Sequence, residues 1–319
     1  MTERRRLVHT AFLFALPIIV AAFGWSVWTA VLAVLLMLLW HWAITLSGFI
    51  IPEKQPPLVL DSISASHFVE KVRWCLDRLG LPYRERQVGG TLGVFFLGRT
   101  VPLLKFRSGA VRSSIGNSPE ILRYLWGRYA AERPDQAEFL RPTPERLAFE
   151  AQIDRCGANL QVWVYHHILP HRDLTLHAWG AGDPAVPVWQ RWLLRLLFPV
   201  LRRLIRFAFR ISPARQQRAV EHVSALLAEV EEKLADGRAS ILGGEALNFS
   251  DFAFAAIMGL WAQPAGYGGG RADAVRLDLA DCPPQMQAEI EAWRRDYPRA
   301  SDFVERLYSE HRGTAGGRA

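Results

Sequence analysis

The chain has 319 residues, half of them hydrophobic, and a formal charge of +7. This length suits about two soluble domains, and the slightly positive mean hydropathy predicts that part of the chain leaves water. A basic balance suits nucleic acid or an anionic membrane, and the uncharged N-terminal region favours the membrane over nucleic acid. Cys75, Cys156 and Cys282 are widely spaced and form no CxxC pair, which argues against a disulfide framework or a zinc site.

The N-terminal region is expected to cross a membrane. Residues 7–51 contain no Asp, Glu, Lys or Arg, and they divide into segments of 17 residues (7–23) and 25 residues (27–51). Basic residues flank both ends, so the positive-inside rule places both ends in the cytoplasm. Residues 1–52 are therefore predicted to form a transmembrane hairpin of an integral membrane protein, in a bacterial inner membrane with its soluble domains facing the cytoplasm. A single span and a cleaved signal peptide are the alternatives.

An α/β unit is predicted after the proline-rich linker at residues 52–57. Apolar residues recur every three to four positions in two segments, which predicts helices there, and short extended segments predict four strands. The helices are expected at 67–79 and 118–129, and the strands at 58–62, 83–88, 101–106 and 110–112. The order is βαβ and then ββα, which predicts a compact domain over residues 58–132.

The chain is predicted to be all-helical over residues 144–311. The expected helices cover 146–169, 188–210 with an interruption at Pro199, 213–236, 249–261, 286–295 and 301–311. Residues 265–271 ("AGYGGGR") are expected to form a flexible loop, and residues 312–319 a disordered tail.

The segment "SASHFVEKVRW" places Ser66 where a strand leads into a helix. A hydroxyl there can donate a hydrogen bond to a bound thiolate, and the helix N-terminus adds partial positive charge. Serine is equally suited to cap the helix, so both interpretations stay open.

Two further segments suggest ligand contacts. A cis bond at Val101-Pro102 would turn the backbone of Val101 outward, where it can pair with a peptide ligand. In "IGNSPEILRYL", Asn117, Ser118 and the free amides of a helix start form either a carboxylate site or a capped helix. The segment "LNFSDFAFAAI" opens another helix with a capping box from Asn248 to Asp251, which is structural.

Together these segments resemble the glutathione S-transferase superfamily, in particular its serine-type classes. "SHFVEKVRWCLDRLGLPY" resembles the first helix of the family, "TVPLL" its cis-proline strand, "NSPEILRYL" its acidic-Ser motif and "LNFSDFAFAA" its C-terminal capping box. The resemblance covers about residues 58–307. It implies a thioredoxin-like α/β domain at 58–132 followed by an all-α C-terminal domain at 144–311.

The resemblance also implies roles for individual residues, with glutathione as co-substrate. Ser66 would stabilise the thiolate, Val101 with Pro102 in cis would contact the cysteinyl part, and Arg99 the glycyl carboxylate. Asn117 and Ser118 would hold the γ-glutamyl amine and carboxylate. Two departures from the family pattern stand out: His67 replaces a frequent proline, and Asn117 replaces an acidic residue, so that one charge for the γ-glutamyl ammonium is missing.

The implied reaction is attack of the glutathione thiolate on a hydrophobic electrophile. The candidates for contacting this substrate are Asn159, Trp163, Tyr165 and His166. No metal is expected, because Pro170 breaks the spacing of the nearby histidines. A non-catalytic scaffold of metaxin-like type and a glutathione-dependent isomerase or peroxidase are the alternative functions, and a homodimer is left open.

The predicted helix at 188–210 is unusually basic. Arg191, Arg195, Arg202, Arg206 and Arg210 form a stripe with Arg203 beside it, and the remaining residues are mostly Trp, Leu, Ile and Phe. This pattern is typical of an interfacial helix on anionic lipid, and it also suits a soluble helix with a solvated basic face.

Overall fold

The computed structural model describes residues 15, 20, 26–50, 58–87, 92, 101–108 and 111–313. The chain divides into two compact units. One contains Met1–Pro57 and Phe106–Ser113, and the other contains Leu58–Lys105 and Ser114–Ala319. The predicted division of the second unit into domains at 58–132 and 144–311 stays a prediction.

The N-terminal prediction needs correction. Residues 7–23 lie outside the described residues apart from positions 15 and 20, whereas α2 (Val27–Ile50) is a helix of 24 residues. In the part of the chain that the structure describes, no helix combines the length and the apolarity that a membrane crossing needs. The predicted integral membrane localisation is therefore wrong, and the hairpin has no support. A membrane span requires one helix that is both long and apolar enough, and an uncharged run in a sequence does not ensure such a helix.

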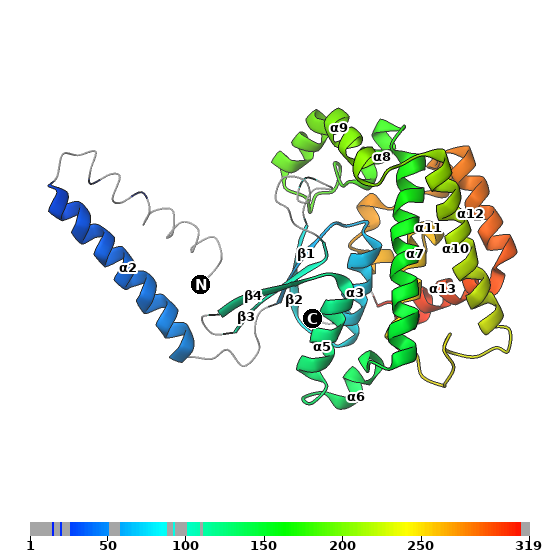
Figure 1. The fold of residues 1–319 in the computed structure, drawn as a ribbon, viewed down its shortest axis with the longest axis horizontal. Coiled ribbons are helices and arrows are strands. Elements are labelled where there is room, and N and C mark those ends of the chain that lie inside the picture. The colour runs from blue at the N-terminus through cyan, green and yellow to red at the C-terminus, as the bar shows by residue number, and fades with distance from the viewer. Residues whose placement is uncertain are drawn as a thin grey trace. The chain divides into compact units, whose positions relative to one another are not determined.

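A mixed four-stranded sheet follows residue 57, and most of its strand residues belong to the larger unit (Figure 1). Its strands are β1 (Leu58–Ser62), β2 (Tyr83–Gln87), β3 (Leu103–Ser108) and β4 (Val111–Gly116), in the spatial order β2-β1-β3-β4. Strand β1 runs parallel to β2 and antiparallel to β3, with Leu60 opposite Leu104. Both leucines are fully buried, so this pair lies in the core of the sheet.

Two helices accompany the sheet, as predicted. They are α3 (His67–Arg78) and α5 (Ser118–Tyr129), which contact each other on the side of the sheet that faces α7 (Figure 1). The apolar positions that predicted α3 are buried, among them Val69, Val72 and Leu76. The predicted βαβ-ββα order is therefore confirmed.

The remainder of the larger unit is helical, which confirms the second half of the predicted fold class. Its helices are α6 (Pro134–Ala137), α7 (Pro144–Ile168), α8 (Arg172–Ala178), α9 (Val188–Ala208), α10 (Pro213–Lys233), α11 (Phe249–Ala262), α12 (Pro284–Asp296) and α13 (Pro298–His311). The short 3-10 turns are η1 (Glu138–Leu140), η2 (Tyr267–Gly270), η3 (Asp273–Val275) and η4 (Leu279–Asp281). Helix α11 is the central one, because it is buried along almost its whole length and contacts α3, α7 and α13. The predicted capping box opens it, with Asn248 N donating to Asp251 Oδ2 at 2.9 Å.

Pro199 does not interrupt α9, which contradicts the prediction for this helix. Proline lacks an N–H and would leave the carbonyl four residues earlier without its helical partner. That carbonyl belongs to Arg195, and Arg172 of α8 donates a hydrogen bond to it at 3.5 Å. A side chain from the neighbouring helix thus replaces the missing backbone donor.

Helix α3 carries buried charges that are all paired. Lys71 Nζ lies 2.6 Å from Glu150 Oε1 of α7, and Arg73 Nη2 lies 2.5 Å from Glu85 Oε1 of β2. Glu70 accepts from Arg312 Nε at 2.7 Å. These pairs tie one helix to the sheet, to α7 and to the end of the described chain.

Arg312 is a third departure from the sequence prediction, which places it in the disordered tail. It is buried, and it also donates to Asp77 Oδ2 at 2.9 Å. Burial opposes the charge of Asp77, but Arg271 and Arg312 outweigh this effect and hold the pKa of Asp77 below its ordinary value. No sequence pattern around an isolated arginine that follows a helix predicts that it will pair with carboxylates such as Glu70 and Asp77.

The glycine-rich segment at 265–271 is also ordered rather than flexible, since Tyr267–Gly270 forms the turn η2. Gly268 and Gly269 have φ values of +74° and +62°, which side chains adopt rarely. A Cβ at Gly269 would lie 2.9 Å from Arg312 Nη2, and a Cβ at Gly268 would lie 2.7 Å from Ala272 Cβ. Gly269 therefore permits close packing against Arg312, and Gly268 permits close packing against Ala272.

Replacing Arg312 by methionine is expected to destabilise the chain. Glu70 is fully buried, and its next cation, Arg73 Nη1, is 3.9 Å away. Removing one partner of a buried ion pair lowers the free energy of unfolding by about 3–5 kcal/mol. Urea unfolding of the full chain measures this loss.

Arg299→Met is the matched control, because Arg299 pairs with Glu231 at 3.1 Å but is 56% exposed. It is expected to lower the free energy of unfolding by less than about 1 kcal/mol. Equal losses in the two variants would contradict the structural role of Arg312.

Candidate functional site

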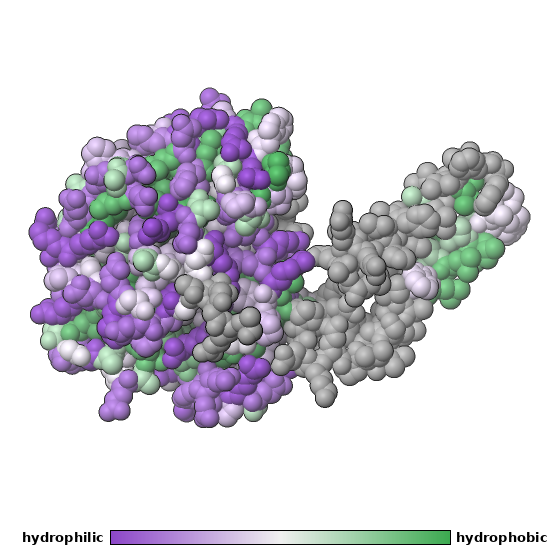
Figure 2. Space-filling model, turned by 180° about the vertical axis from the view of Figure 1, so that it is seen from behind, coloured by the Kyte–Doolittle hydropathy of each residue, from purple (hydrophilic) through white to green (hydrophobic). Residues whose placement is uncertain are grey.

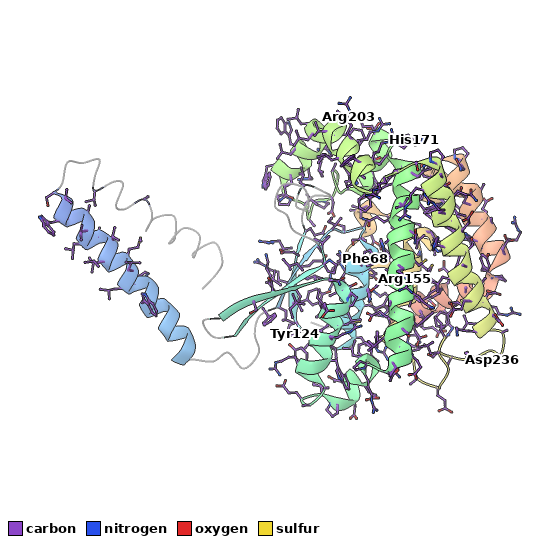
Figure 3. The ribbon with its side chains drawn as sticks, viewed as in Figure 1. Phe68, Tyr124, Arg155, His171, Arg203 and Asp236 are labelled. Atoms are coloured by element: carbon purple, nitrogen blue, oxygen red, sulfur yellow. The ribbon has the colours of Figure 1, made fainter. Side chains whose placement is uncertain are left out.

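A cavity of about 440 Å³ lies in the larger unit, between the sheet side and the helical side. From the sheet side it is lined by Ser66, His67, Phe68, Val101, Pro102, Asn117 and Ser118. From the helical side, Tyr165, Trp179, Phe209, Tyr267 and Leu277 contribute to an apolar wall. Figure 3 shows Phe68 between α3 and α7, where the two sides meet. The cavity brings together Ser66, Val101, Pro102, Asn117 and Ser118, the predicted glutathione contacts that fall in the described part of this unit.

Ser66 is the N-cap of α3. Its Oγ accepts a hydrogen bond from Val69 N at 3.4 Å, a long distance, and its backbone is extended. Capping uses only the acceptor capacity of a hydroxyl, so the Ser66 proton is free to point to a ligand. Both interpretations of Ser66, cap and donor, are compatible with this geometry.

The loop that carries Ser66 is held from several sides. Ser64 Oγ donates to Asp183 Oδ2 at 2.7 Å, and Arg73 Nη1 donates to the Ser64 carbonyl at 2.9 Å. Ser64 Oγ also bonds to Gln87 of β2. The Tyr267 hydroxyl donates to the Ala65 carbonyl at 3.2 Å. Asp183 and Tyr267 come from the helical part, which therefore fixes the position of Ser66.

His67 lies beside Ser66 but is buried and bonded. Its Nε2 lies 3.0 Å from the Gly157 carbonyl, an arrangement in which Nε2 donates and Nδ1 is left as an acceptor. Burial lowers the pKa of His67 to about 4, although the Gly157 bond acts in the opposite direction. The imidazole is therefore neutral near pH 7.

The N-terminus of α5 provides a second polar wall. Ser118 is 1% exposed, and its Oγ has no hydrogen-bond partner among the described residues. Asn117 is exposed at φ +68°, and its side chain makes no capping bond within the described chain. A buried hydroxyl without a partner costs about 1–3 kcal/mol, and a helix N-terminus attracts anions. This wall is suited to a carboxylate.

The Val101-Pro102 peptide bond is cis, as predicted, and both residues line the cavity just before β3. Arg99, the predicted contact of a glycyl carboxylate, lies outside the described residues.

Only one of the four predicted substrate residues lines the cavity. Among the described residues, the cavity wall includes Tyr165 but not Asn159, Trp163 or His166. Asn159 Nδ2 donates to the Arg155 carbonyl at 2.9 Å, and the Trp163 indole donates to Glu289. His166 is half-buried on α7. Asn159, Trp163 and His166 are spaced i, i+4 and i+7 and so share one face of α7, whereas Tyr165 lies on the face that lines the cavity.

Several cavity residues were missed by sequence reasoning. Phe68, Gln161, Trp179, Phe209, Gln263, Tyr267 and Arg276 belong to this group. The strongest signal was available for Tyr267, a single aromatic residue among glycines, which is typical of a side chain held by a tight turn. Trp179 follows α8, a helix that the sequence pattern did not predict.

The three cysteines of the chain are unpaired and buried. Burial raises the pKa of Cys75 and Cys156 to about 12 and that of Cys282 to about 11. Their thiols are therefore protonated near pH 7. No group of three or more His, Cys, Asp or Glu in the described ranges is arranged to hold a metal ion.

The chain is similar to several solved structures, although no family model matches it and a comparison with curated proteins gives no match. A glutathione S-transferase of Methylobacterium radiotolerans, in complex with glutathione sulfonate, is 19% identical with a TM-score of 0.47, over 82% of this chain and 98% of that chain. FzlA from C. crescentus is 17% identical with a TM-score of 0.44, over 80% and 89%. A glutathione S-transferase of Methylobacillus flagellatus, with glutathione bound, is 14% identical with a TM-score of 0.45, over 80% and 99%.

His67 is expected to make stability depend on pH. The unfolded chain takes up a proton at about pH 6.5, whereas the folded chain does so only near pH 4. The burial of neutral His67 therefore lowers the free energy of unfolding of the chain by about 3 kcal/mol as the pH falls between these two values. His67→Gln keeps a donor for Gly157 and should remove this part of the dependence, measured by urea unfolding from pH 7 to pH 4.

His222→Gln is the control, since it makes the same substitution at an exposed position on α10. A pH dependence of His67→Gln identical to that of the wild type would contradict the buried neutral state of His67.

Proposed function

We propose that this chain is a glutathione transferase-like enzyme that binds glutathione and transfers its thiolate to a hydrophobic electrophile. The observation that carries the proposal is a cavity with two helix N-termini on its sheet side, one bearing Ser66 and the other the buried Ser118 hydroxyl, which has no partner among the described residues. A ligand that places a thiolate at the start of α3 and a carboxylate at the start of α5 provides hydrogen-bond acceptors for both hydroxyl groups.

The thiolate is assigned to the start of α3. Ser66 donates its hydroxyl proton to the sulfur, and the partial positive charge of the helix N-terminus acts in the same direction. Together they lower the pKa of the bound thiol from about 8.5, so that a larger fraction is ionised near pH 7. The contacts at Ser64 and Ala65 fix the direction of this donor.

The γ-glutamyl end is assigned to the start of α5. Its carboxylate accepts from Ser118 Oγ and from the free amides of the first turn, while the Asn117 side-chain oxygen accepts from the ammonium. Val101, next to Pro102 on the same wall, supplies backbone groups for the cysteinyl part. Arg99 remains the contact for the glycyl carboxylate that the family resemblance implies.

The electrophile is assigned to the helical side of the cavity. Tyr165, Trp179 and Phe209 form an apolar surface there, which suits a flat hydrophobic molecule. Burial raises the pKa of Tyr165, so its hydroxyl is protonated near pH 7 and can donate to charge that develops on the electrophile. The sulfur attacks an electrophilic carbon, a C–S bond forms, and the leaving group departs with the electron pair.

Replacing Ser66 by alanine is expected to lower conjugation of glutathione to a general aromatic electrophile by about 10–100-fold, because a hydrogen bond to a charged group contributes about 1.5–3 kcal/mol. The pKa of bound glutathione, followed by thiolate absorbance, should rise in parallel. Ser66→Thr keeps the hydroxyl and should retain most of the activity.

A wild-type chain that binds no glutathione would exclude the enzyme and favour a scaffold. Binding without conjugation would favour the isomerase or peroxidase interpretation. Equal activities of wild type and Ser66→Ala would remove Ser66 from the mechanism.

Asn117→Asp is expected to strengthen glutathione binding about tenfold, because it places a carboxylate opposite the γ-glutamyl ammonium in partly exposed surroundings. Aspartate tolerates the positive φ nearly as well as asparagine, so the fold should be preserved. Calorimetric titration at low salt measures the change, and an S-alkyl glutathione should show the same gain. Unchanged or weaker binding would place the ammonium elsewhere.

A further inference from the structure

Helix α9 is apolar on two opposite faces. Leu194, Phe198, Leu201 and Ile205 lie on one face, where they are buried in a cluster with Trp179 and side chains of α8. This face accounts for the attachment of α9 to the larger unit. A helix attached in this way normally turns a polar face outward.

The outward face of α9 is apolar instead. Its exposed side chains are Val188, Trp189, Trp192, Leu196, Val200 and Phe207. Trp189 and Trp192 are each 61% exposed, and Phe207 is 86% exposed. In Figure 2, green side chains reach the surface beside purple ones at the upper right of the larger unit, on the side that carries α9. Contiguous exposed apolar side chains of this size mark an interaction site.

Arginines border this face, and the sequence of α9 contains no acidic residue. In the helical periodicity, Arg191, Arg195, Arg202 and Arg206 fall between the buried face and the outward apolar face, and Arg203 lies at the border of the latter. Arg210 follows the end of the helix. Within the described chain, none of the six forms an ion pair with a carboxylate. Figure 3 labels Arg203 on α9, where it is exposed.

We infer that the outward face of α9 binds the surface of an anionic phospholipid layer. The aromatic and aliphatic side chains enter the boundary between headgroups and acyl chains, and the arginines pair with the phosphates beside it. Arginine suits this position because its planar guanidinium forms paired hydrogen bonds with phosphate oxygens. This attachment lies in the plane of the surface and requires no helix that crosses it.

A second copy of the chain fits this face less well. A two-fold contact would place the same face of α9 against itself and bring the two arginine stripes together. Like charges at an interface oppose association, and the described part of α9 offers no carboxylate to offset them. Charge complementarity therefore selects an anionic surface.

The test uses a fluorescent probe in the full chain. The native cysteines Cys75, Cys156 and Cys282 are buried, so Phe207→Cys can be labelled selectively with an environment-sensitive dye. On addition of equimolar phosphatidylcholine–phosphatidylglycerol vesicles the emission should shift to the blue. Phosphatidylcholine vesicles alone should give a much smaller shift, and salt at about 1 M should reverse it, since the screening length is then about 3 Å.

Asp236→Cys is the control position, because Asp236 is exposed beyond α10, away from α9 in Figure 3. Its probe should not shift. A variant with Arg203, Arg206 and Arg210 replaced by glutamine should bind the anionic vesicles roughly 100-fold more weakly, as read by the Phe207→Cys probe.

Three results would overturn the inference. A Phe207→Cys probe that does not respond to anionic vesicles would exclude insertion of α9. Equal shifts at both labelled positions would show that α9 has no special role. A shift that depends on protein concentration without lipid, with a doubled mass in light scattering, would identify a second copy as the occupant.

Discussion

The position of helix α3 is the constraint on which the site depends. Its N-terminus carries Ser66 to the cavity, while its interior face carries Glu70, Lys71 and Arg73 into the protein core. Each of these charges meets a fixed partner on a different element: Arg312, Glu150 and Glu85. Buried ion pairs contribute little net stability compared with apolar packing, but a misplaced one is costly. We infer that these pairs select one register of α3 against the sheet and α7.

The helical part is therefore more than a cover for the sheet. Tyr267 and Asp183 reach the Ser64-Ala65 loop from sequence positions far beyond α3, and η2 brings Tyr267 into place through glycines with positive φ. A donor whose direction is fixed before a ligand arrives loses little freedom on binding. The same reasoning applies to Ser118, whose hydroxyl is buried at the start of α5.

The spacing of apolar residues and the residues that begin and end helices were sufficient to predict much of this fold. The apolar spacing in α3 and α5, Pro119 after Ser118, and the capping box at Asn248 are local patterns, and local patterns predicted the matching elements. The long-range pairs were not predictable in this way. Arg312 and Tyr267 acquire their roles from residues about 200 positions or more away in the chain. No single segment of the sequence contains that information.

The incorrect predictions also arose because each considered a short segment of the sequence by itself. The membrane prediction counted an uncharged run, whereas a span requires one helix with both length and apolarity. The predicted break at Pro199 treated α9 in isolation, whereas Arg172 supplies the missing donor from α8. Of the substrate candidates on α7, only Tyr165 reaches the cavity, because the other three share a different face of the helix.

The most direct test of the central claim is a crystal structure of the full chain with glutathione. The account predicts that the sulfur lies within hydrogen-bond distance of Ser66 Oγ and that the γ-glutamyl carboxylate contacts Ser118 Oγ at the start of α5. Electron density for the tripeptide elsewhere, or an empty cavity at a glutathione concentration that saturates binding in solution, would contradict it.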